Sequence, residues 1–314
     1  MVTEMEIIRG LDKINREFKD TVVTIGNFDG VHLGHQLLFD ETRQQARSIG
    51  GESLVMTFEP HPVRVLRPES NLKLISKCSK KIELIEKAGV DVLLCISFSR
   101  EFAETTCDQF VDNILWSALH VKGVIVGYDY SFGKGRKGTI DFLKQKGKDL
   151  GFTVTVIEPL YVDGIIVSST KIRELIAAGE MRAVRKLLGR PYQMSGTVLV
   201  GKRRGGSVLG FPTANIELSD NELAPKLGVY AVQVFYDGKS HDGVMNIGYN
   251  PTFGDLAVSA EVHIFDFSED VYGEKIEVNI IERLRDEKKF PGPAELIEQI
   301  KNDVERAKEI LRTE

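Results

Sequence analysis

Apolar runs alternate with amphipathic stretches along the first 188 residues. Short β-branched runs predict strands, and apolar positions at helical spacing predict helices between them. The predicted strands cover residues 22–25, 53–58, 92–98, 124–126 and 152–157, and the predicted helices cover residues 33–49, 80–88, 102–119 and 139–150. Strands separated by helices indicate a parallel sheet, with a ligand crevice at the carboxyl ends of its strands. We therefore predict an α/β domain over residues 1–188.

The pattern changes at residues 189–191, where the sequence Gly-Arg-Pro predicts a linker. Beyond it, short β-type runs separated by turn signals are typical of a small antiparallel barrel or sandwich. These runs cover residues 196–200, 228–235, 243–247, 258–265 and 276–281. A final helix should cover the barrel with an apolar stripe that consists of Ile297, Ile300, Val304, Ala307 and Leu311. We predict residues 189–314 as a second domain, a small antiparallel β-barrel with a terminal helix.

Composition and charge narrow the class of protein. The net charge of −5 argues against a nucleic-acid binder, whose domain would normally be basic, although a few local cations can still bind small anions. The three cysteines form no C-x-x-C pair, so we expect reduced thiols. No signal peptide is visible, and no apolar run approaches the roughly 18 residues of a membrane span. We therefore expect a cytoplasmic protein that acts on small molecules.

The segment from Thr24 to His35, with the sequence T-I-G-N-F-D-G-V-H-L-G-H, carries the most specific chemistry of the first domain. A strand ends there in a glycine-containing turn before a helix, and phosphates bind well at a helix N-terminus because its backbone N–H groups and dipole face them. His32 and His35 flank Gly34 and could hold a nucleotide α-phosphate while another phosphate attacks it. The residues alone leave two alternatives open: two polar side chains on an ordinary turn, or a zinc site that lacks a third ligand with convincing spacing.

This segment resembles the H-x-G-H signature of nucleotidylyltransferases, and its longer form is similar to the start of bacterial bifunctional riboflavin kinase/FAD synthetases. Further matches to that family follow in order at residues 58–62, 127–133 and 167–173. The resemblance implies a Rossmann-like fold with a clamp for the phosphates of ATP, built from helix N–H groups, hydroxyls and an arginine. It assigns the first side of the clamp to Gly26, Asn27, Phe28, Asp29, His32, Gly34 and His35, a ribose or flavin contact to Asp129, and the second side to Ser168, Ser169, Thr170 and Arg173. By their residue types alone, positions 168–170 also fit a cap for the helix over residues 171–178, and the two roles are compatible.

Two glycine-rich sequences imitate other nucleotide sites. The loop Gly133 to Gly138 is a literal G-x-G-x-x-G with Glu158 twenty positions further on, so an NAD-dependent oxidoreductase is an alternative function. The loop follows the fourth predicted strand rather than the first, however, and its basic residues favour a flap. Residues 196–202 resemble a P-loop, but Arg203 stands where a hydroxyl would bind magnesium, so we reject that interpretation.

A second set of candidate residues lies in the C-terminal domain. Residues 201–215 are rich in glycine and basic residues, which suits polyphosphate but equally a flexible solvated loop. The string L-G-F-P-T-A-N at 209–215 resembles the signature of riboflavin kinases, with supporting matches at 228–230, 246–253, 261–266 and 285–290. The resemblance implies Thr213 and Asn215 as oxygen ligands of Mg²⁺ and the ATP phosphates, and Glu261 as general base. It also implies nucleotide or flavin contacts by Gly201, Lys202, Gly210, Pro212 and Arg285.

Strand parity alone gives Glu261 no catalytic role. Val262 and Ile264 define one face of a strand, and Glu261 lies on the other face with His263, where a lone glutamate is usually solvated. Its assignment as the base that accepts the proton of the ribityl 5′-hydroxyl rests on the resemblance.

The resemblance implies two reactions, with magnesium serving both. Riboflavin and ATP give FMN and ADP in the C-terminal domain, and FMN and ATP give FAD and pyrophosphate in the N-terminal domain. One rival hypothesis is a flavin-binding protein without turnover, which would need only one pocket. Another is a chain with one decayed domain, against which stands the presence of every motif in both halves.

Overall fold

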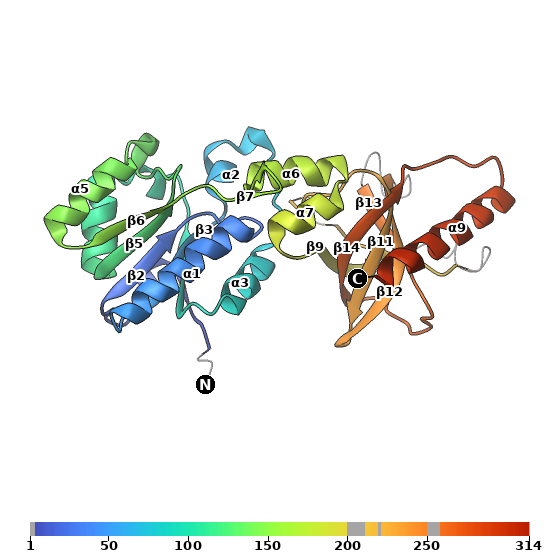
Figure 1. The fold of residues 1–314 in the computed structure, drawn as a ribbon, viewed down its shortest axis with the longest axis horizontal. Helices are drawn as coiled ribbons and strands as arrows, with labels where there is room; N and C mark the ends of the chain where they lie inside the picture. Colours follow the sequence, from blue (N-terminus) through green and yellow to red (C-terminus); the bar gives the residue numbers. More distant parts are fainter. Residues whose placement is uncertain (1–3, 200–210, 219–220, 250–257, 314) are drawn as a thin grey trace. The chain divides into compact units, whose positions relative to one another are not determined.

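The computed structural model describes residues 4–199, 211–218, 221–249 and 258–313. The chain divides into two compact units (Figure 1). The first consists of Met1–Leu72 and Lys77–Ser168, and the second of Lys73–Ser76 and Ser169–Glu314. Within the described ranges, no helix is long and apolar enough to cross a membrane.

The first unit is built on a six-stranded sheet in which every neighbouring pair of strands is parallel. The strand order is β1-β4-β3-β2-β5-β6. The strands are β1 (Glu6–Arg9), β2 (Thr21–Ile25), β3 (Ser53–Glu59), β4 (Val92–Ser97), β5 (Val121–Gly127) and β6 (Thr153–Ile157). The predicted α/β class is confirmed, and β1 is an edge strand that the sequence pattern did not reveal.

Helices cover both faces of this sheet, because its central strands are buried on both sides. One face packs against α1 (Leu33–Ser48) and α3 (Cys78–Lys87), and the other against η4 (Phe110–Ala118) and α5 (Ile140–Leu150). Figure 1 shows α1 and α5 on opposite sides of the strands. The smaller elements are η1 (Leu11–Lys13), α2 (Pro62–Leu66), η2 (Pro68–Ser70), η3 (Phe102–Glu104), α4 (Cys107–Gln109), η5 (Lys134–Arg136) and the hairpin of β7 (Tyr161–Val162) and β8 (Ile165–Ile166).

The single helix predicted over residues 102–119 is wrong. A short 3-10 turn, η3, ends at Thr105, and Thr106 starts a new helix by exchanging capping hydrogen bonds with Gln109. The chain then continues as the π-helix η4. The apolar periodicity was real, but a threonine with a glutamine three positions later is a helix-start signal in the middle of it.

The strand order locates the point where a ligand would bind. From the central strand β2, the chain moves to β3 and β4 on one side and then crosses to β5 on the other. Ligands of open α/β sheets bind at such a switch point, at the carboxyl ends of the strands. The turns that follow β2 and β5 therefore flank the expected crevice.

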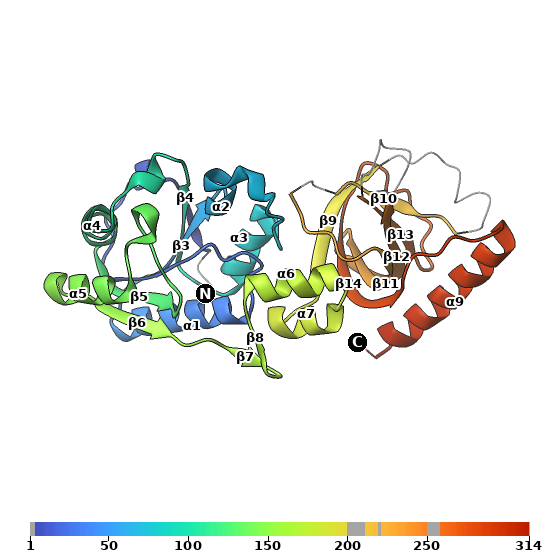
Figure 2. The same ribbon diagram turned by 90° about the horizontal axis from the view of Figure 1, so that it is seen from above.

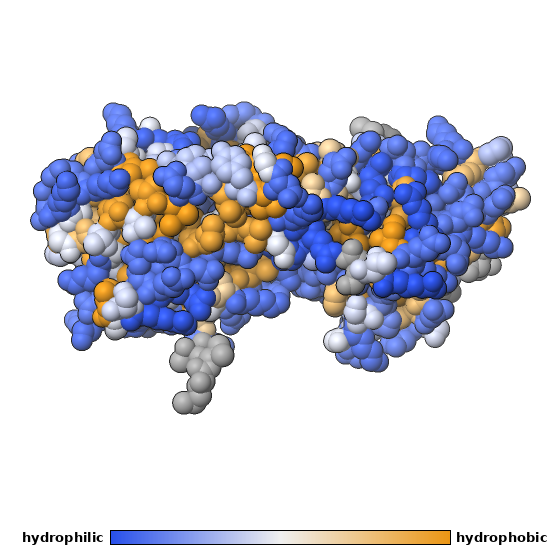
Figure 3. Space-filling view, in the orientation of Figure 1, coloured by the Kyte–Doolittle hydropathy of each residue, from blue (hydrophilic) through white to orange (hydrophobic). Residues whose placement is uncertain are grey.

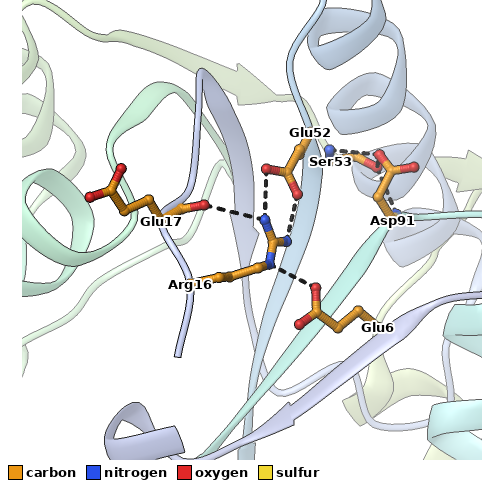
Figure 4. Close-up of polar contacts among 6 residues, drawn as sticks. All are labelled: Glu6, Arg16, Glu17, Glu52, Ser53 and Asp91. Atoms are coloured by element: carbon orange, nitrogen blue, oxygen red, sulfur yellow. Dashed lines mark hydrogen bonds and ion pairs between the residues drawn. The ribbon is translucent and has the colours of Figure 1, made fainter. Parts of the chain in front are cut away.

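The opposite, amino end of the sheet is held by polar contacts (Figure 4). Arg16 Nε donates to Glu6 at 2.9 Å, and its Nη2 donates to Glu52 at 2.6 Å. Asp91 accepts hydrogen bonds from the backbone N–H and the hydroxyl of Ser53 at 2.9 and 2.6 Å. Glu6, Glu52, Ser53 and Asp91 lie at or just before the starts of β1, β3 and β4, and Arg16 lies in the loop before β2. Their contacts therefore join strands rather than form the crevice.

The second unit contains a closed antiparallel barrel and a terminal helix, as predicted (Figure 2). The helix α9 (Pro293–Leu311) packs Val304, Ala307 and Leu311 against the outer side of the strands. The barrel order is β10-β13-β12-β11-β14-β9. The strands are β9 (Tyr192–Leu199), β10 (Ala214–Ile216), β11 (Gly228–Tyr236), β12 (Lys239–Tyr249), β13 (Val258–Ile264) and β14 (Lys275–Arg285).

The second unit also includes parts of the chain that were assigned to the first domain. Helices α6 (Ser169–Ala178) and α7 (Met181–Leu188) belong to it, as does the segment 73–76. Leu74 forms a β-bridge with Glu222, and Arg173 Nε donates to the carbonyl of Lys73 at 3.1 Å. The predicted boundary at residue 188 and the structural units thus differ over α6, α7 and this segment.

Candidate functional site

The turn between β2 and α1 has an unusual backbone. Phe28, Gly30 and Val31 have φ angles of 51°, 82° and 41°. Left-handed φ values are rare for β-branched residues such as valine and concentrate at functional sites. The turn ends at His32, the N-cap of α1, whose Nδ1 accepts a hydrogen bond from the backbone N–H of His35 at 3.3 Å.

The two histidines of this turn form a stacked pair. Their ring centroids lie 3.5 Å apart, with 19° between the ring planes. The buried ring of Phe28 meets His35 edge-on at 5.2 Å, so it supports the pair from the core. A Cβ on Gly34 would lie 3.3 Å from the His32 ring, which gives this glycine a packing reason in addition to the predicted phosphate approach. The arrangement places two fixed imidazoles at a helix N-terminus, where anions bind.

The remaining residues of the first side frame this pair. The Asn27 side chain is exposed, whereas Asp29 is buried. A Cβ on Gly26 would lie 2.8 Å from the Phe28 ring, so the strand end tolerates only glycine while that ring stays in place. The Asn27 carbonyl accepts a hydrogen bond from Thr57 Oγ1 of β3 at 3.2 Å. The turn is therefore held by its neighbouring strand.

Asp129 lies on the other side of the switch point. The register pairs Thr24 of β2 with Ile125 of β5, so Gly26 and Gly127 lie at matching heights in the sheet. Asp129 is exposed, two residues beyond the end of β5. This position fits the predicted contact with a nucleotide bound between the two strand ends, and the contact itself stays a prediction.

The second side of the predicted clamp falls on both structural units. The Val167 carbonyl lies 3.6 Å from the position that a Gly34 Cβ would take, which brings the chain leading to Ser168 beside the histidine turn. Helix α6 begins at Ser169, directly after Ser168. Thr170 is exposed and Arg173 half-buried on this helix of the second unit. That these residues close over one triphosphate stays a prediction.

The two glycine-rich sequences that resemble other nucleotide sites lie in different structural settings from those sites. The loop Gly133 to Gly138 folds back on itself through a bridge between Phe132 and Gly138, and Lys134 forms an ion pair with Glu104 at 2.5 Å. A Cβ on Gly133 would lie 2.8 Å from Cys107 Sγ, so that glycine is required by packing. The loop follows β5 and not β2, unlike a dinucleotide fingerprint. Residues 196–199 of the rejected P-loop are part of β9.

On the outside of the barrel, polar side chains form a row across three strands. The register pairs Asn215 of β10 with Glu261 of β13, and Glu261 with Asn246 of β12. Side chains directly opposite one another on antiparallel strands lie about 4.5–5.5 Å apart at Cβ. The alternate positions Ala214 and Val262 are buried in the barrel, so the row points outward. We call Asn215, Glu261 and Asn246 the polar row.

Glu261 is partly buried within this row rather than fully solvated. Burial raises the pKa of its carboxyl above the ordinary value of 4.5, because it disfavours the charged form. Thr213 directly precedes β10, and its alternation with Ala214 puts it on the same side as Asn215. Nearby, His263 Nδ1 lies 2.8 Å from the carbonyl of Pro212, which ties this segment to β13.

Thr213 and Asn215 together offer oxygen ligands of the kind that fit a metal shared with ATP. Among the described residues, no group of three or more His, Cys, Asp or Glu side chains is arranged to hold a metal ion by itself. Magnesium bound by protein usually keeps several waters and takes further oxygen ligands from substrate phosphates. The hydroxyl of Thr213 and the amide oxygen of Asn215 are suitable additions to such a set.

Four other predicted residues remain. Three of them lie outside the described residues, namely Gly201, Lys202 and Gly210. Arg285 forms a nearly buried ion pair with Asp303 of α9, with its Nη2 at 2.7 Å from the carboxylate. Arg285 thus holds α9 against the barrel. A contact of Arg285 with a ligand stays a prediction.

Asn246 of the polar row had no predicted role, whereas Glu287 belongs to the segment 285–290 for which the resemblance implies a flavin site. Asn246 flanks Glu261, and the Glu287 carboxylate lies against Gly248, where a Cβ would be 2.0 Å from its Oε1. Asn246 stands in a segment that matches the riboflavin kinase pattern. Its place beside Glu261 depends on the β12–β13 register, which periodicity does not give.

Comparison with known proteins finds a different family model for each part of the chain. The family model of FAD synthetase matches residues 14–171, and that of riboflavin kinase matches residues 188–311. The chain is 40% identical to the bifunctional riboflavin kinase/FMN adenylyltransferase of Haemophilus influenzae, over 97% of this chain and 98% of that protein. It is 42% identical to the enzyme of the same name from Listeria monocytogenes, over 90% of each chain.

The whole fold also matches a solved structure. A crystal structure from Streptococcus pneumoniae, described as a macrolide-efflux protein, is 33% identical, with a TM-score of 0.88 over 98% of this chain and 99% of that one. Its description differs from the names of the sequence relatives, but the fold is shared along the full length. Both family models, in this order, and the full-length relatives show that the chain belongs to the bifunctional riboflavin kinase/FMN adenylyltransferase family.

Proposed function

We infer that this chain converts riboflavin to FMN and then FMN to FAD, using ATP in both steps. The observation that carries this conclusion is the match of a separate family model to each half of the chain, each including its own candidate phosphate site. The histidine pair lies within the first match and the polar row within the second. A flavin-storage protein would need neither a second site nor a base.

For adenylyl transfer, we propose that the β2–α1 turn binds the phosphates of ATP. A phosphate oxygen of FMN attacks the α-phosphorus, and the bond from that phosphorus to pyrophosphate breaks. His32, His35 and the N-terminus of α1 would stabilise the negative charge that develops, and because they are already fixed, little reorganisation is needed. The flavin ring needs an apolar surface, and Figure 3 shows apolar side chains gathered along β6 of the first unit.

For phosphorylation, we propose that the riboflavin 5′-hydroxyl attacks the γ-phosphorus of ATP at the polar row. Glu261 takes the hydroxyl proton as the new P–O bond forms, and the bond to ADP breaks. Thr213 and Asn215 would orient the phosphates and hold Mg²⁺. When bound, Mg²⁺ neutralises phosphate charge and orients the leaving group. The three free cysteines agree with the proposed cytoplasmic location.

The decisive experiment is to incubate the purified protein with riboflavin, ATP and Mg²⁺ and to separate the flavins over time. FMN should appear first and FAD should follow, with release of pyrophosphate. Omitting ATP should stop both steps, and omitting Mg²⁺ tests the proposed metal. Absence of flavin conversion would refute the function. Tight NAD binding in an equilibrium titration would instead favour the oxidoreductase alternative.

A further inference from the structure

A buried lysine lies behind the β2–α1 turn. Lys81 of α3 is the only buried lysine or arginine in the part of the chain that the structure describes, with 6% of its surface exposed. Burying an ammonium group is costly unless it is paired and hydrogen-bonded. None of the chemistry proposed above uses it.

The Lys81 ammonium faces the ends of two strands. Its Nζ lies 3.4 Å from the carbonyl oxygen of Asn27, 3.3 Å from Thr57 Oγ1 and 3.3 Å from the carbonyl oxygen of Phe58. The Glu59 carboxylate lies 3.7 Å away and balances the charge. An ammonium has three N–H donors and no acceptor, so these groups together satisfy it.

Two of these contacts, with Asn27 and Thr57, meet at one peptide of the β2–α1 turn. The Asn27 carbonyl oxygen accepts hydrogen bonds from Lys81 Nζ and from the Thr57 hydroxyl. The next residue, Phe28, has a φ of 51°. The same residue carries the exposed Asn27 side chain, and the chain continues from it to the histidine pair. The Lys81 side chain is only 8% exposed, which leaves little surface for a substrate contact.

We propose that Lys81 is a positioning residue for adenylyl transfer, which fixes the Asn27 peptide and so holds the phosphate-binding turn in its working shape. This inference rests on the proposed function of the first unit. Displacing a catalytic constellation by about 1 Å can cost roughly a hundredfold in rate. Lys81→Met should therefore lower kcat for FAD formation about 10–100-fold, without a matching loss of riboflavin phosphorylation by the same preparation.

The matched control is Lys87→Met, which removes an exposed lysine of the same helix and its ion pair with Glu83. It should form FAD at the parental rate. Lys81→Gln keeps N–H donors but not the charge, so it should recover part of the rate that Lys81→Met loses. Thermal melting of each variant separates loss of activity from unfolding, and if Lys81→Met unfolds, Lys81→Gln decides the question.

A double-mutant cycle with Thr57→Val tests the route of the effect, because the Thr57 hydroxyl contacts both Lys81 Nζ and the Asn27 carbonyl. If both side chains act by fixing the Asn27 peptide, the two losses of kcat should not multiply, whereas independent effects would multiply. Multiplying losses, or folded Lys81 variants with parental kcat, would overturn the proposal. A parent protein that forms no FAD would refute the proposed function instead, so the two failures are distinguishable.

Discussion

Replacing Glu261 with glutamine tests the proposed base of the phosphorylation step. Glutamine keeps the size and one oxygen of the side chain but cannot accept the hydroxyl proton. A positioned base contributes roughly 10²–10⁴ in rate, which corresponds to about 3–5 kcal/mol of barrier at about 1.36 kcal/mol per factor of ten. Because Asn215 and Asn246 flank Glu261 in the polar row, the binding surface should survive the change. The loss should therefore appear in kcat and not in KM.

The assay is the initial rate of FMN formation at saturating ATP, measured as a function of pH. Burial raises the pKa of Glu261, so the parental rate should fall, as pH decreases, through a pKa above the ordinary 4.5, and the variant should lack this limb. A raised carboxyl pKa destabilises the folded state as pH rises through it, so the variant should be no less stable at neutral pH. Glu277→Gln on β14 is the matched control, and FAD formation from supplied FMN should be unchanged. A turnover number within a few-fold of the parent would refute the base assignment.

Three further changes test other parts of the molecule. His32→Ala or His35→Ala should reduce FAD formation on the order of 10²–10³ while FMN formation continues, as chromatography of the flavins would show; equal loss of both activities would point to unfolding. Asp303→Ala leaves Arg285 without its nearly buried partner and should lower the free energy of unfolding of the second unit by about 3–5 kcal/mol in a urea titration, and an unchanged midpoint would contradict this. Arg16→Met should lower the free energy of unfolding of the first unit by about 1–2 kcal/mol in the same titration, with both activities intact. A selective loss of adenylyl transfer would show that the amino end of the sheet takes part in catalysis.

The regular layers of both units could be predicted from the sequence, because burial imposes a period on the residues that form them. The strand over residues 92–97 and the apolar stripe of α9 are examples. Short or edge elements carry too few positions for a period, so β1 and the three-residue β10 were not found. The break at Thr106 was missed because its capping signal lies inside an apolar pattern that continues on both sides.

The candidate sites could be predicted only where function concentrates residues along the chain. The histidine turn is contiguous, so its motif identified it. The polar row is assembled from β10, β12 and β13, and its geometry depends on strand register. Lys81 lies more than fifty residues beyond Asn27 and carries no motif of its own. Its contact with that turn arises from the packing of α3 behind the strand ends.

The bridge between Leu74 and Glu222 has a consequence for protein synthesis. Residues 73–76 leave the ribosome well before their partners, and at about 5–20 residues per second the delay until residue 223 is roughly 7–30 s. During that time, the N–H and carbonyl groups of Leu74 lack the bonds that they later form with Asn221 and Leu223. The first unit can form before then, but the second must wait for the chain to return. A kinase fragment cut at residue 189 would lack this early segment and expose the backbone that it covers.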